Sequence, residues 1–129
     1  MANTVTQKTL TGAGSDTYIK RHIHISSDGT EESDLVIFDN SAFCADTSKG
    51  RLVCIKAWGA SAELTFEWDQ STDAEIIRIN PDGPIDVKLG SIGNASNPNG
   101  SGATGDILLS TANLDSGDIV DIIIVVQQA

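Results

Sequence analysis

Apolar and polar residues alternate with a period of two in Ser61-Ala-Glu-Leu-Thr-Phe-Glu-Trp-Asp69. Leu64, Phe66 and Trp68 share one side, and polar residues such as Thr65 share the other. Only an extended chain places every second side chain on the same side, so the stretch predicts a half-buried β-strand. Its bulky inner side needs other apolar strands to cover it.

Two other stretches of the chain are expected to supply that cover. They alternate in the same way, with Val53, Ile55 and Ala57 upstream and Val120, Ile122, Ile124 and Val126 near the C-terminus. Rows of this kind on both sides of a core predict two stacked sheets. The central core residues are therefore expected to be Leu64, Phe66, Trp68, Ile55, Ile122 and Ile124.

Strand-like segments separated by turn signals recur along the whole chain. They lie at 4–10, 18–26, 34–39, 51–58, 61–69, 75–80, 85–89, 106–110 and 118–127. The apolar run 35–38 predicts a buried strand, and Gly59-Ala60 predicts a hairpin between the strands on either side of it. With no helical periodicity, residues 1–129 are predicted to form one all-β domain, an antiparallel β-sandwich of jelly-roll or Greek-key type.

Two segments differ from this strand pattern. Residues 1–12 are expected to be an extended N-terminal segment that contains a weakly apolar edge strand. Residues 90–105 are almost wholly Gly, Ser, Asn and Ala, and they form a long connection for a compact domain. We therefore expect the 90–105 loop to be functional or to lie in an interface.

Composition limits the classes of partner. The chain has 129 residues, of which 40% are hydrophobic, enough for one core without disulfides or metals. Its 18 acidic and 8 basic residues give a formal net charge of −10. Such a surface repels phosphate backbones and anionic lipids, so nucleic acid and membranes are not expected as partners.

Targeting and redox signals are sparse. Cys44 and Cys54 do not have the spacing of a metal or redox motif, and both are expected to be reduced thiols. The first residues lack the basic start and apolar run of a secretion signal, and no run approaches the ~20 apolar residues of a membrane span. We therefore expect synthesis in a cytoplasm.

Each candidate metal-binding or catalytic group is better explained as an ordinary surface feature. His22 and His24 are two residues apart on one strand, a spacing that suits zinc. No Cys or Glu lies nearby in ligand register, so we interpret the two histidines as a ladder of surface side chains. Glu63 and Glu67 lie about 13 Å apart along a strand, too far for glycoside hydrolysis. Calcium at the acidic turn 69–73 is a minor possibility, since the consensus loop is absent.

Nucleophilic and nucleotide motifs are absent from the sequence. Residues 97–106 lack the Gly-Lys-Ser/Thr ending of a phosphate-binding loop, and no Gly-x-Ser-x-Gly elbow occurs. We therefore expect no catalytic residue, no cofactor and no metal, and a hydrolase ranks last among the functions considered. Trp58, Trp68 and Tyr18 would form a sugar-stacking platform if exposed, which keeps a glycan-binding or cell-surface-binding module as an alternative.

Four segments resemble a small structural protein in the virion of tailed bacteriophages. They are Ile19-Lys-Arg-His-Ile-His-Ile-Ser-Ser-Asp-Gly29, Asp34-Leu-Val-Ile-Phe-Asp-Asn-Ser-Ala-Phe43, Glu67-Trp-Asp-Gln-Ser-Thr-Asp73, and Asn97-Pro-Asn with Gly102-Ala-Thr-Gly-Asp-Ile-Leu-Leu109. The resemblance implies a capsid decoration, or cement, protein with a jelly-roll-like sandwich. Such a protein is a dimer or trimer that binds the major capsid protein from outside the shell.

Apolar residues on both sides of 118–127 indicate a central strand or one that packs against another subunit. Together with the N-terminal strand and the Gly/Asn-rich loop, this strand is expected to supply the interface. The predicted interface residues are Val5, Gln7, Ile119, Ile123, Val125, Asn97 and Asn99.

Overall fold

The computed structural model describes residues 3–11, 18–43, 46, 50–59, 61–90 and 95–127. These residues contain nine strands and one short 3-10 helix, η1 (Asn40–Ala42). None of the described helices is long and apolar enough to cross a membrane. The strands are β1 (Thr4–Thr11), β2 (Tyr18–Asp28), β3 (Leu35–Phe38), β4 (Arg51–Gly59), β5 (Glu63–Trp68), β6 (Ala74–Ile79), β7 (Ile85–Lys88), β8 (Ile107–Ala112) and β9 (Ser116–Gln127).

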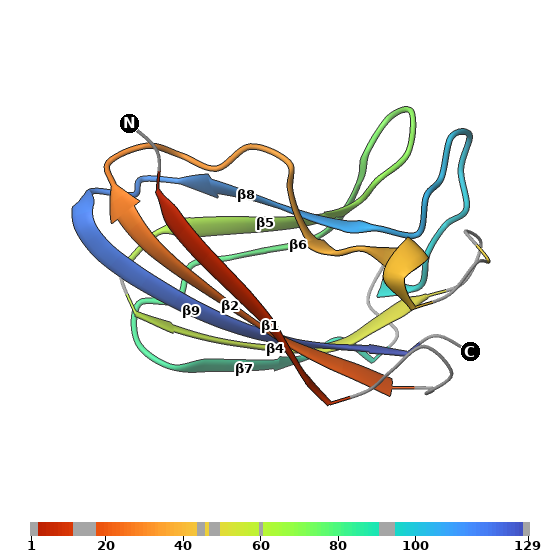
Figure 1. Cartoon of the computed structure of the whole chain (residues 1–129), viewed down its shortest axis with the longest axis horizontal. Helices are drawn as coiled ribbons and strands as arrows, with labels where there is room; N and C mark the ends of the chain where they lie inside the picture. Colours follow the sequence, from red (N-terminus) through yellow and green to blue (C-terminus); the bar gives the residue numbers. More distant parts are fainter. Residues whose placement is uncertain are drawn as a thin grey trace.

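The strands form two antiparallel sheets that pack face to face (Figure 1). Sheet A has the order β1-β2-β9-β4-β7, and sheet B has the order β3-β8-β5-β6. From β2 onward, two four-stranded sheets therefore face each other and the chain passes repeatedly between them, which is jelly-roll topology. The predicted antiparallel β-sandwich is confirmed, and β1 extends sheet A at its edge, as expected for the N-terminal strand.

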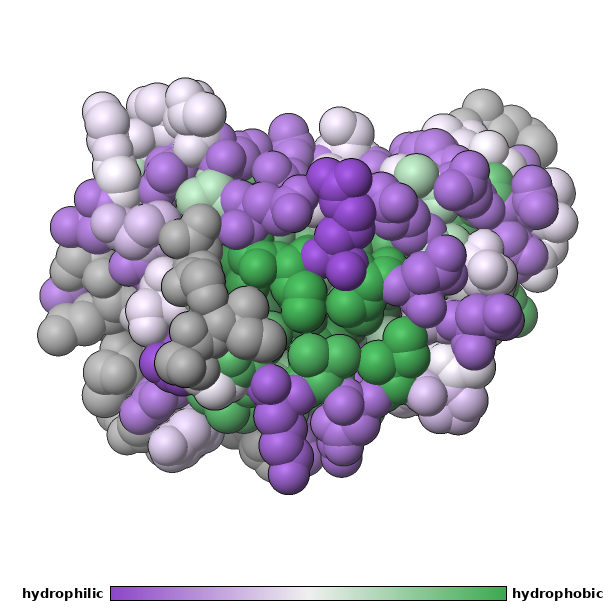
Figure 2. Space-filling view, turned by 180° about the vertical axis from the view of Figure 1, so that it is seen from behind, coloured by the Kyte–Doolittle hydropathy of each residue, from purple (hydrophilic) through white to green (hydrophobic). Residues whose placement is uncertain are grey.

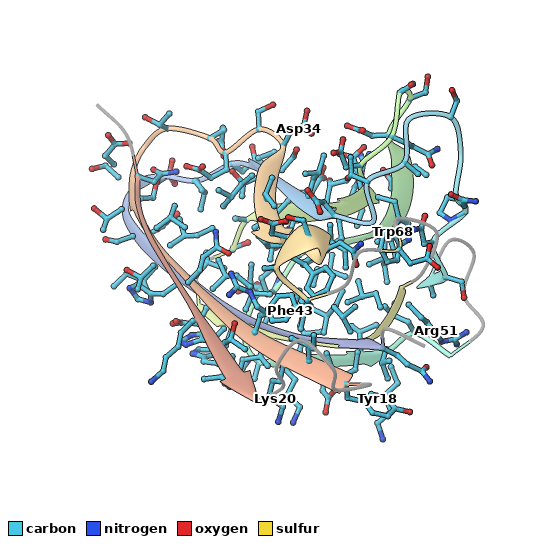
Figure 3. The ribbon with its side chains drawn as sticks, turned by 45° about the vertical axis from the view of Figure 1, so that its right-hand side comes forward. Tyr18, Lys20, Asp34, Phe43, Arg51 and Trp68 are labelled. Atoms are coloured by element: carbon cyan, nitrogen blue, oxygen red, sulfur yellow. The ribbon has the colours of Figure 1, made fainter. Side chains whose placement is uncertain are left out.

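The core lies between the two sheets, where the alternating apolar rows meet. Phe66 is fully buried and Trp68 is only 1% exposed, and Figure 3 shows Trp68 in the space between the sheets. Burial of an aromatic side chain of this size removes about 150–250 Å² of its surface from water. The other predicted core residues, Leu64, Ile55, Ile122 and Ile124, are also fully buried.

The predicted hairpin between the strands around Gly59-Ala60 is wrong. β4 lies in sheet A between β9 and β7, whereas β5 lies in sheet B between β8 and β6. Gly59 has a φ of +121°, which lets the chain leave sheet A at the end of β4. The separation is favourable because the aromatic side of β5 then covers the apolar side of β4 across the core. A hairpin would have placed the two strands side by side.

Two bulges change which side chains point inward. A register shift between Leu52 and Cys54 leaves Val53 half-buried and turns Leu52 fully into the core, the reverse of the predicted alternation. A second shift, between Val36 and Phe38, leaves the consecutive residues Ile37 and Phe38 both fully buried. Val36, before the shift, points outward and is 40% exposed in a strand predicted to be buried. An extra residue in a strand moves the following side chains to the opposite side, and strict alternation cannot foresee it.

Candidate binding face on the outer side of sheet A

The outer face of sheet A consists of the side chains of its five strands that point away from sheet B. Register places these side chains in rows across the sheet. In one row Lys8 of β1 is opposite His22 of β2, which is opposite Ile123 of β9. The row continues with Lys56 of β4 and Asp86 of β7. Residues far apart in the chain thus form one continuous surface.

Exposed hydrophobic side chains concentrate on this face. Among the described residues, five large hydrophobic side chains are exposed, and four of them lie on the outer face of sheet A by strand alternation. Half-buried Ile123 and Val125 lie between them on β9. Figure 3 shows Tyr18 directed away from the space between the sheets. The four are Leu10 at 40%, Tyr18 at 54%, Trp58 at 37% and Ile119 at 48% exposure.

The same face is basic, although the chain as a whole is acidic. Strand register places five of the chain's 8 basic residues on it, whereas of its 18 acidic residues only Asp28, Asp86 and Asp121 lie on it among the described strand positions. The acidic excess therefore lies on other surfaces of the molecule. The five basic residues are Lys8, Lys20, Arg51, Lys56 and Lys88.

Asp121 lies at the centre of this face between two histidines. Its Oδ1 accepts a hydrogen bond from Nε2 of His22 at 2.9 Å and from Nδ1 of His24 at 2.7 Å. Partial burial disfavours the Asp121 carboxylate, but the hydrogen bonds from His24 and His22 outweigh burial and hold its pKa below the ordinary 3.8. Trp58 stacks on His22 with ring centroids 6.1 Å apart. The histidines are thus partly exposed members of a polar ladder, and the absence of a metal here stays a prediction.

Cys54 lies beside this ladder on β4. It is a free, half-buried thiol whose pKa is raised by burial and by Asp86, while Lys56, Lys20 and Lys88 oppose the rise. A thiol with a raised pKa is a poor nucleophile at neutral pH, so Cys54 contributes packing rather than reactivity. Cys44 lies outside the described residues.

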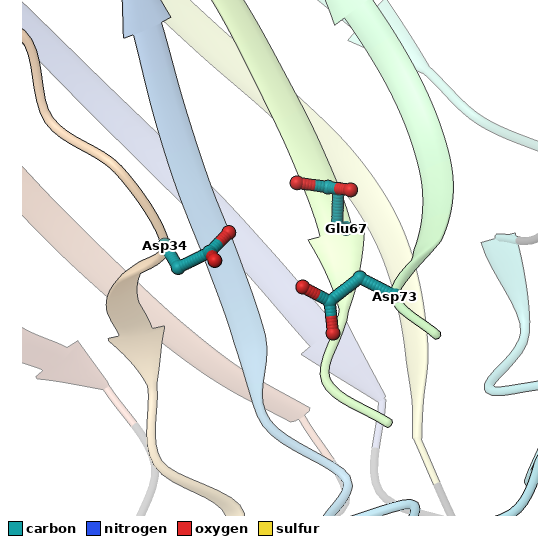
Figure 4. Close-up of side chains that lie close together, drawn as sticks. All are labelled: Asp34, Glu67 and Asp73. Atoms are coloured by element: carbon teal, nitrogen blue, oxygen red, sulfur yellow. The ribbon is translucent and has the colours of Figure 1, made fainter. Parts of the chain in front are cut away.

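A cluster of acids lies on the opposite side of the molecule, outside sheet B (Figure 4). Asp34, Glu67 and Asp73 converge so that one potential ligand atom from each lies within 4.8 Å of the others. Burial, and then the negative charges of Asp34, Asp73 and Glu75, raise the pKa of Glu67. It is the one group of three potential metal-binding side chains in the described parts of the chain. Acidic residues alone do not identify a ligand, however.

The Gly/Asn-rich loop is held against the β5–β6 turn, and Figure 1 shows the two segments side by side. The Ser71 amide donates to the carbonyl oxygen of Ser101 at 2.8 Å, and the Gly100 amide donates to Oε1 of Gln70 at 3.0 Å. Thr104 donates through its hydroxyl to the Asp69 carboxylate at 2.9 Å. The described part of the loop, 95–105, is thus ordered by contacts within the protein.

The predicted interface residues do not form one surface. Ile119, Ile123 and Val125 lie together on the outer face of sheet A. Val5 points inward and packs against the core, and the side chain of Gln7 forms hydrogen bonds within the protein. Nε2 of Gln7 donates to the carbonyl oxygen of Val36, and its Oε1 accepts from Arg21 at 2.6 Å. Asn97 and Asn99 lie in the loop, where the Asn99 amide donates to Oδ1 of Asn97 at 2.9 Å.

Sequence reasoning missed the lysines and Leu10 as parts of this face, and it left the exposure of Trp58 open. Alternation within each strand was visible, but only sheet order makes β1, β2, β4 and β9 neighbours. A second apolar area lies on the side of the molecule opposite that in Figure 1, where Figure 2 shows hydrophobic residues bordered by hydrophilic ones. Its half-buried side chains come from the edge strands β6 and β7 and include Ile77, Ile79, Ile85 and Val87.

No protein family and no curated protein matches the chain. A solved structure described as "Crystal Structure of FeII HppE" is similar over 84% of this chain and 42% of that chain, with 9% identity and a TM-score of 0.30. The chain thus spans less than half of that protein, and a similarity at this TM-score carries no argument.

Proposed function

We propose that this protein is a non-enzymatic capsid decoration protein that binds the outside of an assembled phage shell and stabilises it. The observation that carries the proposal is the concentration of exposed hydrophobic side chains on the outer face of sheet A. Exposed apolar side chains gathered on one face of a small acidic protein favour protein–protein contact. The resemblance of segments such as Ile19–Gly29 and Asp34–Phe43 to tailed-phage virion proteins supplies the kind of partner.

The architecture suits such a role. A compact sandwich with its core filled by Trp68 and Phe66 presents a rigid, preformed surface, which lowers the entropic cost of binding. Many copies that each make a modest contact would reinforce a shell, because a copy that bridges neighbouring capsid subunits adds avidity. The partners are the major capsid protein and, in a homo-oligomer, other copies of the chain. The location is the exterior of the virion.

Co-sedimentation with shells assembled from the major capsid protein of the same phage tests this proposal. The purified protein is expected to pellet with intact shells at micromolar concentration, to saturate at a fixed number of copies per capsid subunit, and to raise the temperature at which the shells dissociate. A protein that stays in the supernatant at every concentration would contradict the proposal. Bovine serum albumin at equal concentration controls for trapping in the pellet.

The exposed aromatic residues favour one alternative, a glycan-binding module. Trp58 and Tyr18 both present exposed rings on the outer face of sheet A, whereas Trp68 is buried and cannot stack on a sugar. Tyr18 pairs with Gln127 through β2, and Trp58 pairs with Asp121 through β4. The rings are therefore attached about 20 Å apart along β9, so they do not form one platform.

Tryptophan fluorescence on a panel of glycans tests this alternative. A glycan that shifts or quenches the emission of the wild type, but not that of Trp58→Phe, would support it. No response across the panel, at millimolar glycan, would leave capsid binding as the better account of the exposed rings.

A further inference from the structure

The outer face of sheet A has both apolar anchors and a charge of defined sign. We propose that this face docks onto an acidic surface of another protein. The assignment rests on the proposed function, and it specifies which side of the molecule meets the shell and what chemistry the shell surface offers there.

The arrangement of this face is that of a protein interface. Apolar Ile119, Ile123 and Val125 lie on β9, the central strand of the five, with Asp121 between the first two. Lysines lie on the strands to either side, with Lys20 on β2 and Lys56 on β4. Interfaces typically have an apolar and aromatic centre surrounded by polar and charged groups. A partner with acidic groups around an apolar centre complements this pattern.

Local charge decides what binds here, despite the net charge of −10. At physiological salt, charges are screened beyond about 8 Å, so a docking surface interacts mainly with the groups that it touches. Three acids are available to oppose the basic residues. Asp86 lies across from Lys56, Asp121 is held by two histidines, and Asp28 lies at the end of β2. The remaining positive charge attracts an acidic partner and disfavours a basic one.

A second copy of the chain fits less well. A two-fold dimer through this face would bring the same basic surface of both copies together, so that lysines such as Lys20 and Lys56 face the basic residues of the other copy. Stacking the face onto the acidic outer side of sheet B, with Glu63, Glu67 and Glu75, would repeat from copy to copy without closing. A distinct acidic protein avoids both difficulties.

The dimensions are adequate for one specific contact. Five strands span on the order of 20 Å, and the paired length from Tyr18 to Ser26 spans roughly 27 Å. A rugged surface of this size approaches the ~800 Å² per partner of a standard interface. The apolar area between β6 and β7 offers no comparable charge asymmetry, because Glu75 and Arg78 flank it on β6 and Asp86 and Lys88 on β7.

Matched variants on the two sides of the sandwich test the assignment. Lys56→Glu and Arg78→Glu make the same charge change, the first on the outer face of sheet A and the second on the outer side of sheet B. Ile119→Asp and Val36→Asp similarly replace hydrophobic side chains that are 48% and 40% exposed. Each is compared with the wild type by co-sedimentation with empty, DNA-free shells at 50 and 300 mM salt. Circular dichroism and thermal melting establish that each variant is folded.

We expect Lys56→Glu and Ile119→Asp to weaken binding at least tenfold, and Arg78→Glu and Val36→Asp to bind within about twofold of the wild type. Wild-type binding is expected to weaken at the higher salt concentration. Equal binding by all folded variants, or selective loss with Arg78→Glu and Val36→Asp, would overturn the assignment and leave the proposed function intact.

Two other results would also count against it. Wild-type protein that does not bind the shells would overturn the proposed function and this assignment together. Native mass spectrometry of the wild type and Ile119→Asp gives the second of these results. A wild-type oligomer that dissociates in Ile119→Asp would show that a second copy, and not an acidic partner, covers this face.

Discussion

Trp58 stacks against His22 across the outer face of sheet A, with ring centroids 6.1 Å apart and ring planes inclined by 18°. The other tryptophan, Trp68, is only 1% exposed. The two indoles should therefore be separable by fluorescence, because acrylamide reaches only an exposed ring. Trp58→Phe is expected to leave a blue-shifted emission that acrylamide barely quenches, with a change in unfolding free energy of about 0.5 kcal/mol or less.

Trp68→Phe is the matched control for this measurement. It is expected to retain the quenchable emission of Trp58 and to lower stability, since a smaller ring leaves a cavity in the core. Strong acrylamide quenching in Trp58→Phe would show that Trp68 is accessible in solution.

The carboxylate of Asp121 is expected to stabilise the fold in a pH-dependent way. Asp121→Asn should lower the unfolding free energy by about 1 kcal/mol at pH 7, because the hydrogen bonds from His22 and His24 lose a charged acceptor. The folded-state pKa of Asp121 lies below the ordinary 3.8, so its contribution is present above that pH and is lost as the pH falls through the folded-state pKa. Urea denaturation at pH 7 and pH 3 should therefore show a smaller difference at pH 3.

Asp86→Asn controls for removing a negative charge from the same face. It lies across from Lys56 and is exposed, so we expect a change of only a few tenths of a kcal/mol. An Asp121→Asn protein as stable as the wild type at pH 7 would contradict the prediction.

Glu67 should have the opposite effect on stability. It is directly opposite Glu75 in the β5–β6 pair and lies beside Asp34 and Asp73, and burial together with these charges raises its pKa above the ordinary 4.5. The ionised form is thus disfavoured in the folded state. Its cost is fully present above the folded-state pKa and vanishes as the pH falls below 4.5. Glu67→Gln is expected to raise stability at pH 7 by a few tenths to about 1 kcal/mol.

Thermal melting at pH 7 and pH 4, in EDTA, measures this gain. Glu63→Gln is the control, because Glu63 pairs with Arg78 at 3.4 Å on the same side of sheet B and its removal should slightly lower stability. A Glu67→Gln protein less stable than the wild type at pH 7 would show that other interactions in solution offset the repulsion and burial of the ionised Glu67 carboxylate.

The fold could be predicted from the sequence because period-two alternation is a local property. Leu64, Phe66 and Trp68 could only be aligned by an extended chain, and their bulk required a second sheet. Sheet order is not local, so the sequence did not indicate that His22 meets Asp121, 99 residues away. The bulge at Val53 was also hidden, because an inserted residue has no side-chain signature.

The candidate site was predictable only where one strand carried it. Ile119, Ile123 and Val125 share β9, and their apolar character on an outward side was readable from the sequence. Lys8 and Lys56 join them only through the pairing of β1, β2, β9 and β4. Val5 and Gln7 were placed in the interface because an edge strand was expected to bind a partner. The structure instead turns both inward, and their interface role stays a prediction.

The crossing from β4 to β5 depends on a position that tolerates no side chain. Gly59 has a φ of +121°, and a β-carbon there would overlap the carbonyl oxygen of Ile119 in the neighbouring strand β9. Gly83 has a similar φ of +99°, but a β-carbon there would meet nothing within 4 Å. Gly83→Ala should therefore cost only the backbone strain, about 1–2 kcal/mol. Gly59→Ala should cost more, because β9 must also move away from β4, which disrupts the packing of both strands. Urea denaturation of the two variants measures the difference, and equal losses of stability would show that the close approach of Gly59 to Ile119 relaxes without cost.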